Sequence, residues 1–235
     1  ATGGPAGMYK NSVYPGSQHG ASGIAFLAGA KGKNLTEWQF GLASVKPRWN
    51  VSGSYMQVIP RFISTDQDGN DAKEFLIENM GDLGTVMNMV FLKGYQWPFD
   101  VRKLKAGSSS IDYWVYIELF IKKRRVFLDY RDNPGCKPFD PSLLSEEAFT
   151  YLNASGAIGG TPFERLEKLN QPAIDFYRDR EVDLKTQPLE ISLSVQHNNG
   201  GISISSDWET DIKNLYAVGE VSASHGVYRP GGTAL

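Results

Sequence analysis

The chain has 235 residues, of which 41% are hydrophobic and 21% charged, and its formal net charge at pH 7 is −2. This balance excludes a disordered chain and argues against a charge-driven partner such as nucleic acid, and the length suffices for one large domain or two small ones. The single cysteine, Cys136, can form neither an internal disulfide nor, by itself, a thiolate metal site. Apolar stretches fall far short of the roughly 20 residues that cross a bilayer. The sequence therefore predicts a soluble protein without a membrane span, favours the cytoplasm, and leaves the periplasm and secretion open.

Both ends of the chain are rich in glycine. The chain opens on Ala1-Thr2-Gly3-Gly4 without an initiator Met and stops at Leu235, just after a glycine turn. We expect a fragment of a longer protein whose two glycine-rich ends meet in space and share one site. The small-residue run Ala21–Ala30 predicts a helix that packs closely against a sheet.

Short aromatic and β-branched runs follow between Leu35 and Ile63 and predict strands. The segment Asp66–Asp71 predicts a hairpin turn. An EF-hand loop is the alternative, but it requires its glycine at the sixth position, and here Gly69 is the fourth. Helices are predicted at 74–80 and 82–92.

In the central part of the chain, the serines at 108–110 predict an N-cap for a helix from Ile111 to about Lys122. The basic run 122–125 then invites a nucleic-acid interpretation. Cations at a helix C-terminus are also favoured by the helix dipole, and we prefer this structural interpretation because the chain has no wider basic excess. A strand is expected at 126–130, a turn at 133–135, and helices at 143–153 and 163–178.

Strands are predicted at 189–195, 201–205 and 215–218, the last leading directly into Gly219-Glu220. The sequence thus predicts an α+β fold, in which a region of roughly 36–192 is inserted between two glycine-rich outer pieces.

Three residues near the C-terminus are candidates for chemistry. His197 lies among amides beside Gly200-Gly201, a turn that a ligand could approach closely because it carries no side chains. Glu220 follows a predicted buried strand, where a carboxylate can accept from sugar or ribityl hydroxyls. Arg229 lies between glycines, and its planar guanidinium matches a carboxylate or phosphate. The alternatives are a turn-capping histidine, a surface salt bridge and a solvated arginine.

Other candidates are weaker. His19 and Cys136 are interpreted as structural, since Cys136 has no histidine nearby in the sequence. The chain contains no Gly-x-Ser-x-Gly elbow, no phosphate-binding P-loop and no His-rich or Cys-rich metal spacing. The sequence therefore predicts no metal and gives no support to a hydrolase or a P-loop enzyme.

The end segments resemble the fumarate reductase and succinate dehydrogenase flavoprotein family, which includes L-aspartate oxidase and related FAD-dependent reductases. The likeness lies in motifs that occur in the family's order and cover about 80 residues; the middle of the chain matches only in outline. The matching motifs are the Ala-Thr-Gly-Gly start, Glu37–Phe40 at the start of a substrate-capping domain, His197 with Gly200-Gly201-Ile202, the Leu-Tyr-Ala-x-Gly-Glu motif at 215–220, and 225–235, with its Arg-x-Gly-Gly-x-x-Leu pattern.

The resemblance implies an oxidoreductase in which FAD exchanges hydride with a carboxylate-bearing small molecule. It implies a substrate-capping domain at 36–192, inserted between two pieces of an α/β FAD-binding domain at 1–35 and 193–235. His197 and Arg229 would bind and polarise the substrate carboxylate. Glu220 would hold ribose or ribityl hydroxyls. The positions expected to line the cofactor are Gly3, Gly4, Gly219, Gly231, Gly232 and Ala234.

Departures from the family pattern qualify this implication. Gly41-Leu42-Ala43 stands where many members have His-Pro-Thr, which removes one substrate-binding histidine. Phe99 replaces the arginine of an Arg-Asp-Val motif, and Arg102 is the candidate substitute for that catalytic acid. Thr233 replaces a common asparagine. A flavoenzyme for a non-dicarboxylate substrate and a non-catalytic binding module of the same fold are the two alternatives.

The dinucleotide fingerprint Gly-x-Gly-x-x-Gly is absent from the sequence. This motif grips the cofactor pyrophosphate at a helix N-terminus. We therefore expect this polypeptide alone to bind FAD weakly or not at all, and to be inactive.

Overall fold

A computed structural model describes residues 3–9, 12–13 and 21–224 of the chain. The chain divides into two compact units. Unit 1 comprises Ala1–Gly41 and Ser194–Leu235, and unit 2 comprises Leu42–Leu193. Unit 2 is thus one continuous segment, whereas unit 1 is assembled from two segments that are distant in sequence.

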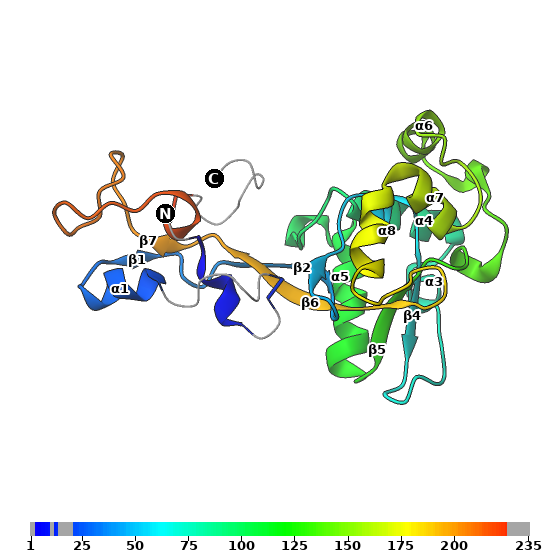
Figure 1. The fold of residues 1–235 in the computed structure, drawn as a ribbon, viewed down its shortest axis with the longest axis horizontal. Coiled ribbons are helices and arrows are strands. Elements are labelled where there is room, and N and C mark those ends of the chain that lie inside the picture. The colour runs from blue at the N-terminus through cyan, green and yellow to red at the C-terminus, as the bar shows by residue number, and fades with distance from the viewer. Residues whose placement is uncertain (1–2, 10–11, 14–20, 225–235) are drawn as a thin grey trace. The chain divides into compact units, whose positions relative to one another are not determined.

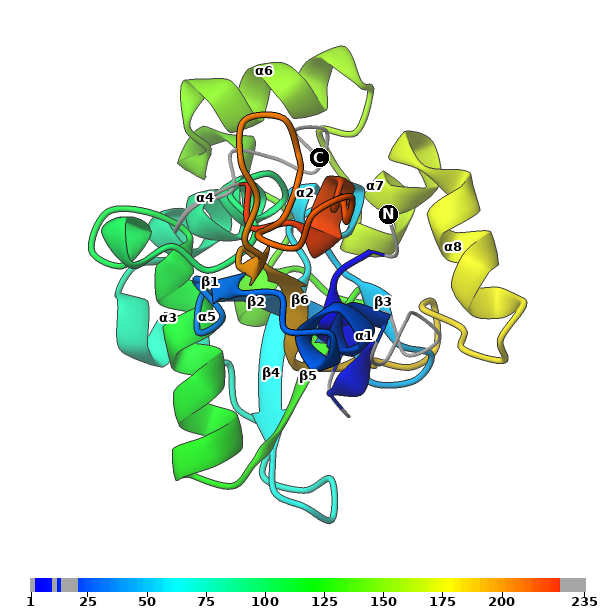
Figure 2. The ribbon, with the colours of Figure 1, turned by 90° about the vertical axis from the view of Figure 1, so that its left-hand side faces the viewer.

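The main sheet has five strands in the order β3-β2-β6-β5-β4. Its pairs β2/β3, β4/β5 and β5/β6 are antiparallel. β2 and β6 each run from one unit into the other, and the strands of this sheet are labelled in Figure 2. Their bounds are β2 Trp38–Ser44, β3 Trp49–Asn50, β4 Arg61–Thr65, β5 Arg125–Asp129 and β6 Leu189–Asn198.

The strands β4 and β5 form the most regular part of this sheet. Each is buried on both faces after its first residue, so Val126 and Leu128 on one side and Phe127 on the other all lie inside the protein. Continuous apolar burial of this kind is typical of a strand that is covered on both sides. The expected strand at 126–130 is therefore confirmed, shifted by one residue.

Helices supply most of the remaining core of unit 2. Side-chain caps begin several of them: Asp82 accepts from Thr85 N, Ser145 from Ala148 N, and Thr161 forms a capping box with Glu164. Figure 1 shows these helices in order of colour from cyan to yellow. Their bounds are α2 Ser54–Gln57, α3 Phe75–Met80, α4 Leu83–Lys93, α5 Ser109–Tyr116, α6 Glu146–Ala154, α7 Pro162–Leu169 and α8 Gln171–Arg178, and short 3-10 turns occur at Val101–Lys103, Pro134–Cys136 and Pro141–Leu143.

Two expected helices differ in detail. The helix expected at 163–178 is two helices, because Asn170 ends α7 and begins α8. The helix expected at 111–122 begins at Ser109 and continues after Tyr116 as a π-helix, Ile117–Ile121. Ser108, at its N-cap position, makes no capping bond; its hydroxyl donates to the carbonyl of Gln96 instead.

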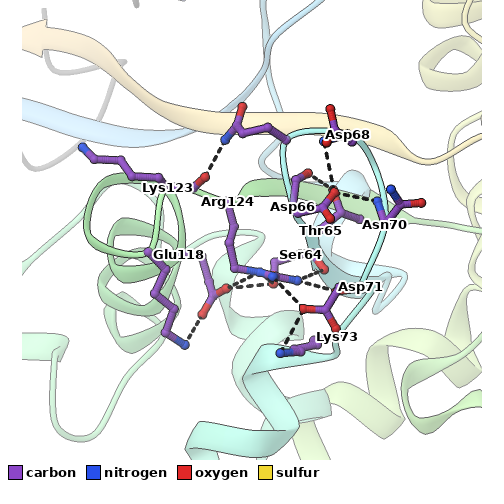
Figure 3. Close-up of polar contacts among 12 residues, drawn as sticks. Ser64, Thr65, Asp66, Asp68, Asn70, Asp71, Lys73, Glu118, Lys123 and Arg124 are labelled. Atoms are coloured by element: carbon purple, nitrogen blue, oxygen red, sulfur yellow. Dashed lines mark hydrogen bonds and ion pairs between the residues drawn. The ribbon is translucent and has the colours of Figure 1, made fainter.

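The expected turn at 66–71 and the basic run 122–125 lie side by side in Figure 3. Asp66 closes the turn by accepting from the backbone of Asp68 and Asn70, which confirms a hairpin turn. Arg124 contacts the buried carboxylate of Glu118 at 3.3 Å and Asp71 at 3.0 Å.

Two further cations of the run also have carboxylate partners. Lys122 pairs with Glu118 and Arg125 pairs with Glu190. These pairings support the structural interpretation of the basic run.

Unit 1 is smaller and has a thinner core. It contains α1 (Ala21–Leu27), a two-stranded antiparallel sheet of β1 (Gly32–Lys33) and β7 (Gly201–Ile202), and 3-10 turns at Pro5–Met8 and Gly219–Val221. Figure 2 shows α1 and β1 in blue. The helix α1 packs on β7 with its small residues Ser22 and Ala25 buried, while Leu27 is 92% exposed. The expected close packing of a small-residue helix is confirmed, although the helix ends three residues early.

Of two further strands expected in unit 1, the one at 215–218 is wrong and the one at 201–205 is shorter than expected. The segment 215–218 forms only an isolated bridge, between Tyr216 and Glu209. Tyr216 is 57% exposed, and Ala217 is the buried member of the segment. The strand expected at 201–205 ends at Ile202. Among the described residues, no helix is long and apolar enough to traverse a lipid bilayer.

Candidate functional site

The last four residues before the Gly200-Gly201 turn form a buried polar tract in unit 1. Gln196, His197, Asn198 and Asn199 are each 2% exposed or less, and three of them belong to β6. Buried polar side chains are costly unless they are hydrogen-bonded. This concentration of four in sequence is therefore a feature to be explained by its partners.

His197 has a carboxylate partner. Its Nδ1 lies 2.6 Å from Oε1 of Glu220, which sits in the 3-10 turn Gly219–Val221. Because a carboxylate accepts hydrogen bonds, Nδ1 carries the proton and donates. The ring is 1% exposed and the Glu220 side chain 23% exposed. Two of the three residues expected to share one site, from positions 23 residues apart, are thus in direct contact.

Two glycines adjoin Glu220. Gly4 is buried, and a Cβ added there would lie 2.5 Å from Glu220 Oε1. Any side chain at this position would therefore displace the carboxylate. Gly219 has φ +75°, a left-handed conformation that glycine adopts without strain, and it precedes Glu220 directly. Both glycines serve to place the carboxylate beside the histidine.

The Gly200-Gly201 turn is approached by backbone of the same chain. A Cβ at Gly200 would lie 2.0 Å from the carbonyl oxygen of Asn34, and one at Gly201 would lie 2.3 Å from that of Val221. Our interpretation that the missing side chains admit a ligand is therefore replaced by a structural one. These glycines let the segments at 33–34 and 221–222 pack against the end of β6.

Three amide side chains in the same unit carry buried atoms without a hydrogen-bond partner in the described part of the chain. These atoms are both amide atoms of Gln196, Oδ1 of Asn198 and Oε1 of Gln39. The Nδ2 of Asn198 donates to the carbonyl of Leu35 at 3.1 Å. The amides beside His197 are evident in the sequence, but no pattern there predicts a role for them.

The remaining expected site residues have different outcomes. Arg229, Gly231, Gly232, Ala234 and the expected structural His19 lie outside the described residues. Gly3 has φ +75°.

Arg102 belongs to unit 2 and forms a fork with Asp100, donating from Nε and NH2. These bonds from Arg102 hold the pKa of the Asp100 carboxyl below its usual value. The expected role of Arg102 as a catalytic acid stays a prediction.

Cys136 is an exposed thiol beside Arg61 and Glu74 in unit 2. Partial loss of solvent around the sulfur raises the pKa of the thiol, and Glu74 raises it further against the opposing effect of Arg61. A thiol with a raised pKa is a poor nucleophile at neutral pH. The part of the chain that the structure describes contains no group of three or more His, Cys, Asp or Glu side chains able to hold a metal ion.

Comparison with known proteins confirms the resemblance stated above. Residues 137–235 match the family described as "FAD binding domain". The chain is 35% identical over 92 residues to one subunit of the fumarate reductase (CoM/CoB) of Methanothermobacter marburgensis, covering 39% of this chain and 16% of that protein. It is also 35% identical over 141 residues to an uncharacterized FAD-dependent oxidoreductase of Methanocaldococcus jannaschii, covering 55% and 24%. The chain thus spans a quarter or less of these relatives.

Solved structures share the fold. A quinol-fumarate reductase solved with menaquinol molecules superimposes with a TM-score of 0.55 at 18% identity, over 96% of this chain and 34% of that chain. Sdh1 of Mycobacterium smegmatis, in complex with UQ1, gives a TM-score of 0.59 at 18% identity, over 99% and 32%. The mixed helix and strand fold of this chain is therefore that of part of these flavoproteins.

Proposed function

We propose that this chain is part of an FAD-dependent oxidoreductase that exchanges hydride between the flavin and a carboxylate-bearing substrate. The observation that carries the proposal is the buried hydrogen bond between His197 and Glu220. It joins two motifs that resemble those of fumarate reductase and succinate dehydrogenase flavoproteins. The match of residues 137–235 to an FAD binding domain and the likeness to a fumarate reductase subunit support it.

The residues of unit 1 fit a hydrogen-bonding cofactor. Gln39, Gln196 and Asn198 hold buried amide atoms for which the described residues supply no partner, and a flavin offers both donors and acceptors. Gly4 leaves the space that the Glu220 carboxylate occupies. Bound FAD would supply the two-electron carrier, and Glu220 would be placed near its hydroxyls. Gly3, Gly219, Gly231, Gly232 and Ala234 are proposed to line it.

The histidine acts on the substrate in this proposal. Glu220 accepts from Nδ1 and so orients the imidazole of His197, which would contact the substrate carboxylate. Arg229 would grip the same carboxylate with its planar fork. The positive charge of Arg229 would stabilise the negative charge that develops when hydride arrives at the neighbouring unsaturated carbon. Arg102 stays the candidate donor of the accompanying proton.

A specific observation favours a substrate other than a dicarboxylate. Leu42 and Ala43, which stand where many members of the family have Pro and Thr, are fully buried apolar residues, and Gly41 replaces the histidine. Gly41 has no side chain with which to bind a second carboxylate, and Leu42 belongs to the apolar core of unit 2. We therefore propose monocarboxylate enoates as the first substrates to assay.

The first experiment titrates the 235-residue chain with FAD while flavin fluorescence is followed. We expect weak binding or none, because the pyrophosphate-gripping motif is absent from the sequence. Tight stoichiometric binding would contradict this expectation.

The second experiment uses the full-length protein with reduced viologen as donor and a panel of enoates. We expect His197→Ala and Arg229→Ala to reduce turnover by about 100-fold or more while FAD content is retained, the scale typical of a lost charge-stabilising group. Unchanged turnover in both variants would contradict the roles proposed for these two residues, and no turnover in the parent would favour a non-catalytic binding module.

A further inference from the structure

Gln196 presents an unusual buried amide. The residue is 2% exposed, and neither Oε1 nor Nε2 has a hydrogen-bond partner among the residues that the structure describes. Leaving such groups unpaired costs free energy for each atom, so native proteins rarely do so without a reason. Either rotamer of the amide offers a donor group and an acceptor, so a suitable partner must offer both as well.

The position of Gln196 on β6 separates it from His197. Side chains alternate between the faces of a strand, so Gln196 and Asn198 lie on one face and His197 on the other. Asn198 adds a third unpartnered atom, Oδ1, on the face of Gln196. The polar tract thus has two chemically different sides, and the histidine side already has a carboxylate partner, Glu220, within the described residues.

Resting on the function proposed above, we propose that Gln196 is a flavin-positioning residue whose side-chain amide pairs with the imide edge of the isoalloxazine ring. That edge carries an N3–H donor next to a carbonyl acceptor, so it complements both atoms of the amide. A carboxylate substrate offers acceptors alone and would leave Oε1 unpaired. The chemistry of the pair therefore assigns the amide to the flavin rather than to the substrate.

The proposal requires a small movement. Both amide atoms are covered by protein in this structure, whereas the adjoining turn is held by the close packing of Gly200 and Gly201 on neighbouring backbone. The turn cannot move without losing those contacts. The side chain of Gln196 is therefore the part that rotates to meet the ring.

The test is Gln196→Met in the full-length protein, since methionine keeps the length of the side chain and removes both hydrogen-bonding groups. We expect FAD to bind about tenfold more weakly or worse, the loss of a typical hydrogen-bonded pair. We expect the thermal midpoint of the FAD-free protein to be unchanged or raised, because an unpaired amide no longer has to be buried. The control is Gln57→Met in unit 2, where Gln57 accepts from the hydroxyl of Tyr151 at 3.2 Å; FAD affinity should not change there.

A flavin with a methyl group on N3 tests the same contact without relying on the variant's folding. We expect N3-methyl-FAD to bind the parent protein about tenfold more weakly than FAD, and the Gln196→Met variant to bind both equally. A lower midpoint with unchanged FAD affinity would overturn the proposal and mark the amide as structural, bound to internal water. Weakened substrate binding with unchanged FAD affinity would also overturn it. Failure of the parent protein to bind FAD at all would instead refute the proposed function.

Discussion

Two glycines of unit 1 differ in whether the structure has room for a side chain: Gly201 has none, whereas Gly23 has open space. A Cβ at Gly201 would lie 2.3 Å from the backbone oxygen of Val221, which cannot move without the turn that carries it. We expect Gly201→Ala to destabilise the protein by about 1–3 kcal/mol through overpacking. The measurement is urea unfolding combined with hydrogen exchange of the β7 amides.

The matched control for that substitution is Gly23→Ala in α1, where an added Cβ meets nothing within 4 Å. Alanine is the better helix former, so this variant should be unchanged or more stable by about 0.5–1 kcal/mol. Equal losses in both variants would show that the close approach of Val221 does not limit residue 201.

Asp129 gives unit 2 a predictable response to acid. Burial by itself would raise the pKa of its carboxyl, but bonds from Arg131 at 2.8 Å and Arg61 at 2.7 Å outweigh burial and lower it. Because the carboxyl has a lower pKa in the folded state, it stabilises that state at pH values above about 3.9, the ordinary pKa of an aspartate. This contribution is lost as the pH falls through the lower folded-state pKa.

We therefore expect Asp129→Asn to cost about 3–5 kcal/mol of unfolding free energy at pH 7, since two guanidinium groups lose a buried partner. The difference from the parent should shrink below about pH 4, as the carboxyl becomes neutral in both states of the parent protein. Urea unfolding between about pH 2 and pH 7 measures it across that window. The exposed Asp68→Asn variant serves as the control, and a pH-independent difference at Asp129 would contradict the assigned cause.

At the residue scale, the sequence predicted which residues belong to the candidate site better than it predicted what each of them does. His197 and Glu220 could be chosen from their glycine settings and from family motifs, and they are in contact. The reason for Gly200 and Gly201 could not be found in the same way, because the oxygens that exclude a Cβ belong to Asn34 and Val221, far away in sequence. Unpaired amides are likewise a property of packing and leave no pattern in the chain.

At the scale of elements, the break between α7 and α8 depends on one residue. The side chain of Asn170 accepts from Ala173 N at 3.2 Å and donates to Ser54 Oγ at 2.9 Å. We expect Asn170→Ala to cost about 1 kcal/mol, the usual value of an N-cap, as measured by thermal unfolding. Gln171→Ala, one residue later on the exposed surface, should change stability by less than about 0.5 kcal/mol. A larger loss of stability in Gln171→Ala than in Asn170→Ala would show that the cap is not the stabilising contact.

The elements that the sequence predicted well are those fixed by local chemistry. The hairpin turn at Asp66 closes with its own side chain, and β5 is a short apolar run. The missed helix break was readable from Pro172, which favours an end just before it, but apolar periodicity dominated the prediction. The false strand at 215–218 had the composition of a strand, yet composition cannot show whether a pairing partner lies beside it.

At the scale of the whole molecule, the two units have unequal cores. The apolar cluster of unit 2 includes Leu166 and many other fully buried residues, whereas the described cluster of unit 1 is built on Ala25, Ala30, Ile202, Ala217 and Val221. The stabilisation from burial scales with the apolar area removed from water. Because the two clusters share no residue, we expect two unfolding transitions in calorimetry, with unit 1 unfolding at the lower temperature.

Substitutions in each core assign the transitions. Leu166 is fully buried, and its replacement by alanine should lower the upper midpoint through a loss of about 2–5 kcal/mol, leaving the lower midpoint in place. Ile202→Ala should lower the lower midpoint alone. The strands β2 and β6 run through both units and could couple them, since a continuous backbone can transmit unfolding. A single transition that both variants shift equally would show that this coupling exceeds the difference between the cores, and that the units fold as one.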